Sequence, residues 1–252
     1  MSDEIFDSIS KLNNIFKKIY NLGFVDGINE KSKGNAGITF EKLLGKENDN
    51  FQIADFNGIE IKVQNKFKSK ILRLFSLVPS NSFGIELKRL RNLYGKNDYF
   101  FKNIKTLQCF VSASASSTLH SGYKLKLEID YLNEKLYLLI FNKYNELIEK
   151  KIYWDFDELI KMINKKLNIL AIVNFKNQKI NNINQFHYTN ISYYSIKSSV
   201  VFFKLIEIGK IKINFDLGIY RSGTKTGKEH DNGVFFYIDN NDFFKLYNKI
   251  DL

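Results

Sequence analysis

Apolar and polar residues follow two periods along this chain. Apolar side chains at helical spacing predict helices, which span residues 4–21, 85–94, 156–167, 196–208 and 241–249. Alternation with a period of two predicts strands, which span residues 58–63, 71–78, 123–129, 135–141, 211–220 and 234–238. The continuous apolar run 169–175 predicts one more strand, buried on both faces. The mixture predicts an α/β protein.

Charge adds a preference for polyanionic partners. The 252 residues include 38 Lys and Arg against 27 Asp and Glu, for a net charge of +11. A basic balance of this kind favours nucleic acid. The chain is also dense in Lys, Asn, Ile, Phe and Tyr, the residues of AT-rich codons, so part of the excess reflects codon bias. Only clusters of basic residues therefore bear on function.

Several other classes of protein do not fit the sequence. The single cysteine, Cys109, excludes an intrachain disulfide and an all-cysteine metal site. The three histidines lie far apart, without the spacing of zinc ligands. No apolar run approaches the ~18 residues of a membrane span. The N-terminus is acidic and unlike a signal leader. We expect a cytoplasmic protein.

The most informative cluster joins three carboxylates and a lysine. Glu60 and Lys62 alternate with apolar residues in the strand 58–63, so both point to one face. Asp55 precedes a predicted tight turn at Gly58, and Glu41 lies on a short apolar-patterned segment just upstream. Such a cluster suits a hard divalent cation, which takes oxygen ligands, and phosphodiester hydrolysis, in which the lysine acts on a water or on phosphate charge.

A solvated strand face with a weak ion pair is the competing interpretation of Glu60 and Lys62. The same Glu-x-Lys spacing recurs at Glu86 and Lys88 and again at Glu149 and Lys151. Asp55 and Glu41 distinguish the first occurrence from the other two.

Two loops and one helix carry candidate DNA contacts. The glycine-containing loop 31–37 and the loop 221–233 allow close backbone approach, and their side chains suit phosphates or base edges. A basic loop making only phosphate contacts is the alternative for the second. The candidates are Lys33, Asn35, Arg91, Arg221, Lys225, Lys228, His230, Asp231 and Asn232.

Blocks over nearly the whole chain resemble, in order, the MvaI/BcnI restriction endonuclease family, a MutH-like branch of the PD-(D/E)xK nuclease superfamily. The blocks are residues 34–44 (GNAGITFEKLL), 54–56 (ADF), 59–62 (IEIK), 90–98 (LRNLYGKND), 153–157 (YWDFD), 165–167 (KKL), 218–223 (GIYRSG) and 227–233 (GKEHDNG). Ala54 stands where the superfamily name has proline, at a position that shapes the turn and does no chemistry.

The resemblance implies a fold, a reaction and a set of site residues. The fold would be a restriction-endonuclease-like mixed sheet flanked by helices, with two lobes forming a DNA cleft. The catalytic lobe would span 1–115, with 155–175 packing on it, and 116–252 would be mainly the DNA-recognition lobe. Glu41, Asp55, Glu60 and Lys62 would be catalytic, with the three carboxylates holding Mg²⁺; Mn²⁺ would suit the same oxygen ligands.

The implied activity is that of a type II restriction enzyme on double-stranded DNA. The site would be short and pseudosymmetric, of the CC-N-GG kind, although Arg221 stands where the relative has a histidine. With one active-site block in one chain, a monomer would have to act twice, or dimerise, to cut both strands; we expect a monomer that cuts one strand at a time. A cognate DNA methyltransferase is expected in the same system. The alternatives are a MutH-like nicking enzyme of mismatch repair and a catalytically silent DNA-binding protein.

Overall fold

The computed structural model describes residues 3–30, 32, 34–45, 54–65, 70–81, 85–221, 223–230 and 233–252. The chain forms two compact units that interleave in sequence. Unit 1 comprises Met1–Lys70, Ile163–Lys197 and Tyr247–Leu252, and unit 2 comprises Ile71–Met162 and Ser198–Leu246. Residues 71–115 of the expected catalytic lobe lie in unit 2, whereas 163–197 and 247–252 lie in unit 1.

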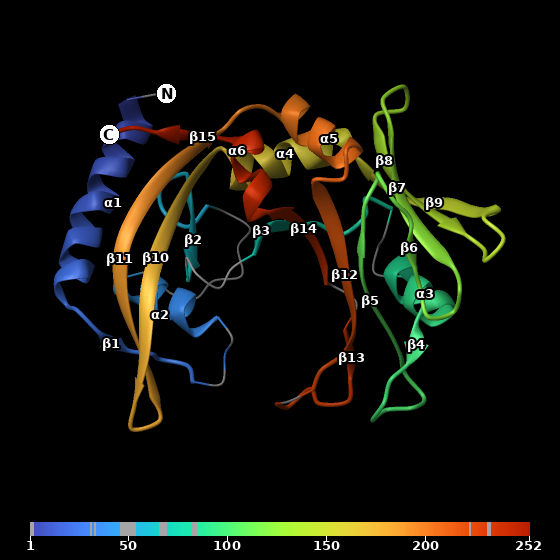
Figure 1. The fold of residues 1–252 in the computed structure, drawn as a ribbon, viewed down its shortest axis with the longest axis horizontal. Coiled ribbons are helices and arrows are strands. Elements are labelled where there is room, and N and C mark those ends of the chain that lie inside the picture. The colour runs from blue at the N-terminus through green and yellow to red at the C-terminus, as the bar shows by residue number, and fades with distance from the viewer. Residues whose placement is uncertain are drawn as a thin grey trace. The chain divides into compact units, whose positions relative to one another are not determined.

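Unit 1 is a five-stranded mixed sheet with two helices. Its elements are α1 (Asp3–Asn21), β1 (Val25–Asp26), α2 (Asn35–Leu43), β2 (Ile59–Gln64), β10 (Ile169–Ile180), β11 (Ile183–Ile196) and β15 (Tyr247–Ile250). The strand order is β1-β11-β10-β2, and β15 pairs with β11. β10 and β11 form a long antiparallel hairpin, whereas β2 runs parallel to β10 (Figure 1).

The core of unit 1 lies between α1 and one face of this sheet. Leu12 and Phe16 of α1 are buried in one cluster with Ile59, Ile61 and Ile169. The predicted inward face of the strand 58–63 is thereby confirmed. Because side chains alternate along a strand, Glu60 and Lys62 lie on the opposite face.

Unit 2 contains a six-stranded and a four-stranded sheet. The first has the order β3-β14-β12-β5-β4, with β13 pairing β12, and the second has the order β6-β7-β8-β9. The strands are β3 (Ile71–Ser76), β4 (Lys96–Asn97), β5 (Lys105–Val111), β6 (Ser117–Thr118), β7 (Lys124–Asp130), β8 (Lys135–Phe141), β9 (Leu147–Asp155), β12 (Ile211–Ile219), β13 (Glu229–His230) and β14 (Val234–Asp239).

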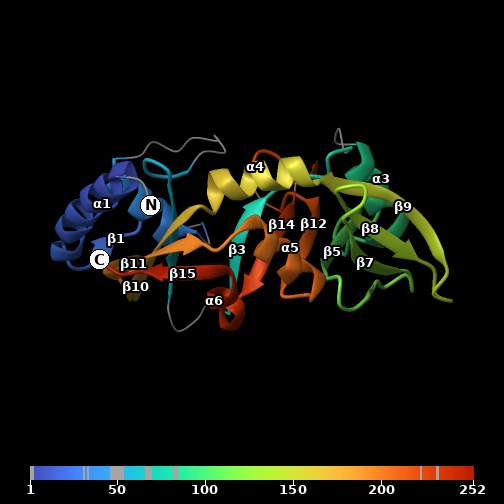
Figure 2. The same cartoon turned by 90° about the horizontal axis from the view of Figure 1, so that it is seen from above.

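Unit 2 also contains several helices. They are α3 (Ile85–Tyr94), α4 (Phe156–Lys166, whose last turn belongs to unit 1), α5 (Ser199–Glu207), the 3-10 turn η1 (Asn240–Asp242) and α6 (Phe243–Leu246). α3 packs on β5, and α5 packs on β7 and β12 (Figure 2). Trp154, fully buried, donates from its indole nitrogen to the Leu77 carbonyl at 3.0 Å.

Most predicted elements are present, and one prediction needs correction. The predicted helix 241–249 ends early, because residues 247–250 pair with β11 as the edge strand β15. Strands β9 and β11 were not predicted, since their polar and apolar residues alternate irregularly.

Candidate active site and nucleic-acid surface

A two-residue turn places Asp55 beside β2. Phe56 and Ile59 bridge each other through two backbone hydrogen bonds of 2.9 and 2.8 Å. Between them Asn57 and Gly58 both have positive φ, at 42° and 84°. Asn-Gly is the sequence that such a turn prefers, because glycine has no Cβ to clash. The turn brings the Asp55 carboxylate to the Ile61 N–H, which donates to Oδ2 at 2.9 Å.

Glu60 is buried and holds a lysine on each carboxylate oxygen. Only 4% of the residue is exposed. The Lys62 ammonium pairs with Oε1, and the Lys166 ammonium donates to Oε2 at 2.9 Å. A carboxylate this far from water requires partners of opposite charge. The sequence analysis identified Glu60 and Lys62 and did not identify Lys166 as a site residue.

Strand register explains how Lys166 reaches Glu60 from 106 positions away in the chain. β10 begins at Ile169 and runs parallel to β2, with Ile169 beside Ile59 and Leu170 beside Glu60. α4 ends at Lys166, just before β10. The end of this helix therefore meets the start of the catalytic strand. Lysines in the last turn also suit the negative end of the helix dipole.

Glu41 lies on α2, which packs against β2. Within the described ranges, however, no group of three His, Cys, Asp or Glu side chains is placed to hold a metal ion. The expected cluster of three carboxylates is thus not assembled in this conformation. In this conformation both Glu60 carboxylate oxygens contact lysines.

The remaining donors still fit a hard cation. Mg²⁺ is usually held by one or two carboxylates together with waters and substrate phosphates, and Asp55 and Glu60 supply two. Charge is favourable as well, since the partly exposed Lys62 ammonium would attract a phosphate group. The donor set contains only oxygen, which selects Mg²⁺ or Mn²⁺ over softer metals.

Two buried amide oxygens continue the polar face of the sheet beyond Lys62. Gln64 follows Lys62 by two positions, and Asn174 of β10 lies beside Gln64 in the parallel register. Neither Gln64 Oε1 nor Asn174 Oδ1 accepts a hydrogen bond from the described residues, although both atoms are buried. A buried acceptor of this kind needs a donor from solvent or ligand. The period-two pattern of β2 carries the signal for Gln64, which the sequence analysis missed.

Two of the expected DNA contacts are structural residues, which corrects the prediction. Arg91 is 0% exposed and donates to the Lys105 carbonyl at 2.9 Å and to Glu229 at 2.9 Å. The Asn35 side chain accepts from the Asn29 N–H at 2.9 Å and is also buried. Helical and loop patterns gave both residues a polar role without showing that other parts of the chain cover them.

The remaining candidate DNA contacts form two groups, those that the structure describes and those that lie outside the described residues. Lys33, Asp231 and Asn232 lie outside the described residues. Lys225 and Lys228 are exposed on the loop before β13, and the Lys225 ammonium lies 5.5 Å from the ring centre of Tyr220. His230 packs on Tyr220 with ring centroids 5.0 Å apart. These side chains gather at one end of β12 and β13.

Arg221 forms a two-pronged ion pair with Asp98. Nη1 donates to Oδ1 at 2.9 Å, and Nη2 pairs with Oδ2. This hydrogen bonding from Arg221 lowers the pKa of Asp98 to about 2. Arg221 therefore fixes a neighbouring turn in this conformation, and its two-pronged edge does not face solvent as a guanine reader would.

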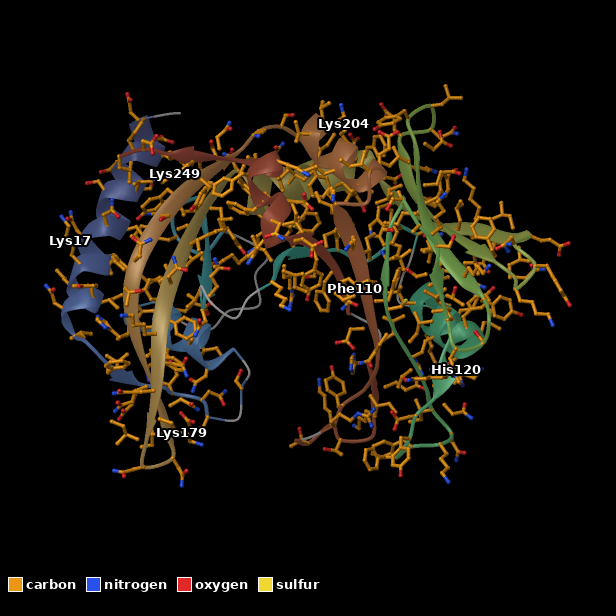
Figure 3. All side chains as sticks on the ribbon, viewed as in Figure 1. Lys17, Phe110, His120, Lys179, Lys204 and Lys249 are labelled. Atoms are coloured by element: carbon orange, nitrogen blue, oxygen red, sulfur yellow. The ribbon has the colours of Figure 1, made fainter. Side chains whose placement is uncertain are left out.

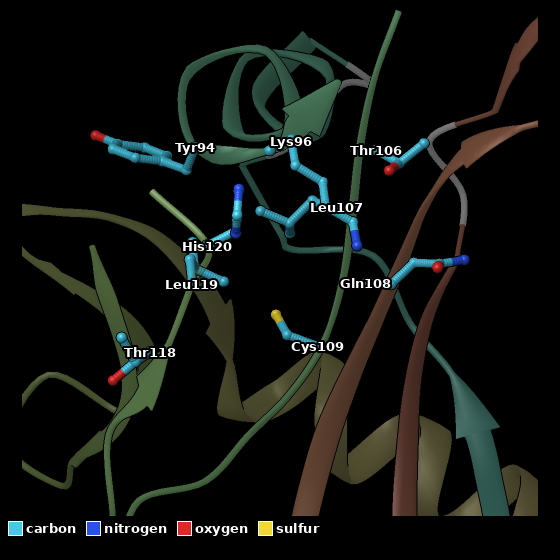
Figure 4. A pocket seen from close by; sticks show the side chains of 10 residues that line it. Tyr94, Lys96, Thr106, Leu107, Gln108, Cys109, Thr118, Leu119 and His120 are labelled. Atoms are coloured by element: carbon cyan, nitrogen blue, oxygen red, sulfur yellow. The ribbon is translucent and has the colours of Figure 1, made fainter. Parts of the chain in front are cut away.

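A pocket in unit 2 does not compete as a small-molecule site. Tyr94, Gln108, Cys109 and His120 are among the residues that line it (Figure 4), and its volume is about 120 Å³. Small-molecule sites usually measure ~300 Å³ or more. Burial raises the pKa of the Cys109 thiol to about 12, so it is a poor nucleophile.

In the part of the chain that the structure describes, no helix is long and apolar enough to cross a membrane.

The fold is a mixed sheet flanked by helices, as in the restriction-endonuclease class, and Asp55, Glu60 and Lys62 lie together on one turn and strand of it. The model of the MvaI/BcnI restriction endonuclease family matches residues 13–247, so this chain belongs to that family. It is accordingly a type II site-specific deoxyribonuclease. Comparison with curated proteins finds no match.

Two solved structures of restriction endonuclease MvaI are similar to this chain. The complex with its cognate DNA substrate shares 29% sequence identity and superposes with a TM-score of 0.89. The structure in the absence of DNA shares 26% identity with a TM-score of 0.61. Each alignment covers 99% of this chain and 98% of the other. The likeness thus extends over both units, and the expected restriction-endonuclease fold is confirmed.

Proposed function

We propose that this chain hydrolyses phosphodiester bonds of double-stranded DNA at a short, pseudosymmetric sequence with the help of Mg²⁺. The observation that carries the proposal is the joined arrangement of Asp55, Glu60 and Lys62 on one turn and strand. The similar MvaI structure is a complex with cognate DNA, which supports DNA as the substrate here. A site of the CC-N-GG kind fits the family.

Asp55 and Glu60 would hold the metal ion, with Glu41 from α2 as a further carboxylate. When bound, the ion would neutralise phosphate charge and lower the pKa of a bound water. Restriction endonucleases in general use divalent ions, and the oxygen-only donors favour Mg²⁺, with Mn²⁺ as the nearest substitute.

Lys62 would act on the scissile phosphate or on the attacking water. Its ammonium lies on the solvent side of Glu60, with a quarter of its side chain exposed. A preorganised ammonium stabilises the negative charge that develops on a phosphoryl oxygen during attack. Lys166 is a positioning residue in this proposal, because it acts through Glu60 Oε2. It holds that carboxylate in place beside Lys62.

The surface around the loop before β13 would hold the DNA. Lys225 and Lys228 would contact phosphates, and His230 would lie at base edges, with Lys33, Asp231 and Asn232 as further candidates. We also propose that the chain acts as a monomer on one strand at a time, in the cytoplasm. A methyltransferase of the same specificity would protect the host DNA.

The direct test is cleavage of a long, sequenced, unmethylated DNA with Mg²⁺, with EDTA as control. We expect discrete ends that share one short sequence, obtained by sequencing the ends. Nicks alone at such a sequence would favour the MutH-like alternative. Binding without any cleavage in Mg²⁺ or Mn²⁺ would contradict the proposal.

The site residues have a separate test. Lys62→Ala and Asp55→Ala should each abolish cleavage and leave DNA binding intact, because both side chains lie at the edge of the core. Lys18→Ala, on the last turn of α1, is a matched control that should cleave normally. Full activity in either site variant would remove the residue from the proposed site.

A further inference from the structure

Two large aromatic side chains project from unit 2 where the fold does not need them. Tyr99 is 83% exposed and Phe100 is 76% exposed, in the turn between β4 and β5. Their rings meet edge to face, with centroids 5.0 Å apart. Single exposed apolar residues are common. Two adjacent exposed aromatic rings, however, form a contiguous apolar surface of the kind that often contacts a partner.

The Asp98 side chain stabilises the turn that carries these rings. The Asp98 carboxylate accepts from the N–H groups of Phe100 and Phe101 at 2.9 and 3.0 Å. The same carboxylate receives both prongs of Arg221 and is almost fully buried. Two backbone hydrogen bonds, Asp98 N–H to the Ile104 carbonyl and Ile104 N–H to the Phe101 carbonyl, close the turn. Tyr99 and Phe100 therefore lie on a turn whose backbone is held in place by these hydrogen bonds.

The surroundings of the rings are basic. Exposed lysines flank them on both loops, namely Lys96, Lys102, Lys225 and Lys228. The loops touch, because Phe101 packs against Gly227, and the Arg221 guanidinium lies 5.8 Å from the Phe100 ring centre. The nearby carboxylate of Glu229 is already paired with Lys88 and Arg91. The surface therefore favours a polyanion with flat, apolar faces.

We propose that Tyr99 and Phe100 contact duplex DNA directly, with their rings against deoxyribose and base surfaces in a groove. The inference rests on the proposed function, and it adds a contact that the charged loop cannot supply. Apolar side chains that meet the bases add affinity by stacking or by wedging at a base step. Such contacts release no counterions, so they act independently of salt.

The first experiment uses the protein's single tryptophan as an internal reference. Trp154 is fully buried, so Phe100→Trp adds one exposed fluorophore. The probe is a short duplex that contains the sequence shared by the cut ends, in EDTA to prevent cleavage. We expect the Phe100→Trp emission to be quenched as DNA is added. The matched control is Tyr144→Trp, at a 70% exposed position on the β8–β9 turn, which should respond little.

The second experiment separates ring contacts from charge. Tyr99→Ala with Phe100→Ala should weaken binding about tenfold, as expected for lost stacking, and leave the dependence of affinity on salt unchanged. Lys225→Ala with Lys228→Ala should make that salt dependence shallower. Both aromatic residues are exposed, so the double variant should unfold at the wild-type temperature.

The outcomes of these experiments are separable from those of the proposed function. If wild-type protein binds and cuts DNA while Phe100→Trp is not quenched and the aromatic double variant binds normally, the ring contact is wrong and the nuclease stands. A double variant that loses affinity with a shallower salt dependence would also overturn it, since the turn would then act only through its charges. A wild-type protein without DNA affinity would remove both proposals.

Discussion

At the scale of single residues, the proposed active site is organised around one buried carboxylate. Glu60 is in contact with two ammonium groups that come from different elements, Lys62 on the same strand and Lys166 at the end of α4. Removing one partner from a buried ion group leaves a charge with less compensation, which is costly. The two lysines differ in position, since Lys62 is the more exposed and Lys166 lies behind Glu60.

Lys166→Met should therefore impair cleavage by misplacing Glu60. We expect a loss on the order of 10²-fold in kcat, comparable to removal of one preorganised charge, and a higher Mg²⁺ concentration for half-maximal activity. Lys166→Arg should restore part of both. The control is Lys165→Met, the exposed neighbour on α4. A Lys166→Met enzyme with an unchanged Mg²⁺ requirement would limit Lys166 to a structural role.

Asp98 gives a prediction that depends on pH. Its pKa in the folded protein is about 2, and the largest cause of this lowering is the hydrogen bonding from Arg221. In an unfolded chain the pKa of Asp is about 3.9. The ionised pair therefore stabilises the fold above about pH 5. This contribution decreases as the pH falls toward 2. Urea unfolding of wild type and Asp98→Asn should differ at neutral pH and converge in acid; a constant difference would contradict the assignment.

At the scale of elements, the turn before β2 and the end of α4 together build the site. The Asn57-Gly58 turn fixes Asp55 against the backbone of β2, and parallel pairing with β10 delivers Lys166. The turn joins residues that are close in sequence, whereas the strand pairing joins residues that are far apart. The site therefore depends on the register of β10 on β2.

Gly58→Ala tests the turn. A Cβ at this position would meet only the Ile5 side chain at 3.6 Å, so the cost comes from the backbone φ of +84°. We expect about 1 kcal/mol of destabilisation, with a larger relative loss of cleavage as Asp55 shifts. Gly58→Asn, which tolerates positive φ, should be milder in both thermal unfolding and cleavage assays. Equal behaviour of the two variants would show that the turn conformation does not matter.

The difference between local and distant devices also explains what the sequence could predict. Asp55, Glu60 and Lys62 lie within eight consecutive positions, and turn and strand patterns were sufficient to place them. Lys166 required the register of β10 on β2, which no local pattern contains. Arg91 and Asn35 were misassigned because their burial depends on other segments. Tyr247 to Ile250 form an edge strand through pairing with β11, against a helical pattern.

At the scale of the whole molecule, a net charge of +11 predicts a strong general affinity for DNA. The exposed lysines extend over both units. Lys179, for instance, lies near the turn of the β10–β11 hairpin in unit 1 (Figure 3), whereas Lys225 and Lys228 belong to unit 2. Phosphate contacts alone carry no sequence information. Specificity for one DNA sequence must therefore come from particular side chains among these basic residues.

Affinity for an unrelated duplex should therefore fall steeply with salt, by about 10³-fold or more between 50 and 200 mM if about six phosphates are contacted. Fluorescence anisotropy at several salt concentrations measures this slope. EDTA should stop cleavage and leave this non-specific binding unchanged. A flat salt dependence would show that the basic excess reflects codon usage.

The parallel pairing of β2 with β10 has a consequence for the order of folding during synthesis. β2 leaves the ribosome long before its partner strand, and the 92 residues of Ile71–Met162 are made in between. The nascent N-terminal segment then contains Asp55, Glu60 and Lys62 but no strand beside them. Since unpaired strands are poorly stable, the catalytic sheet can form only after β10 emerges. A host cell would thus be exposed to nuclease activity only from chains in which most of the protein has already been translated.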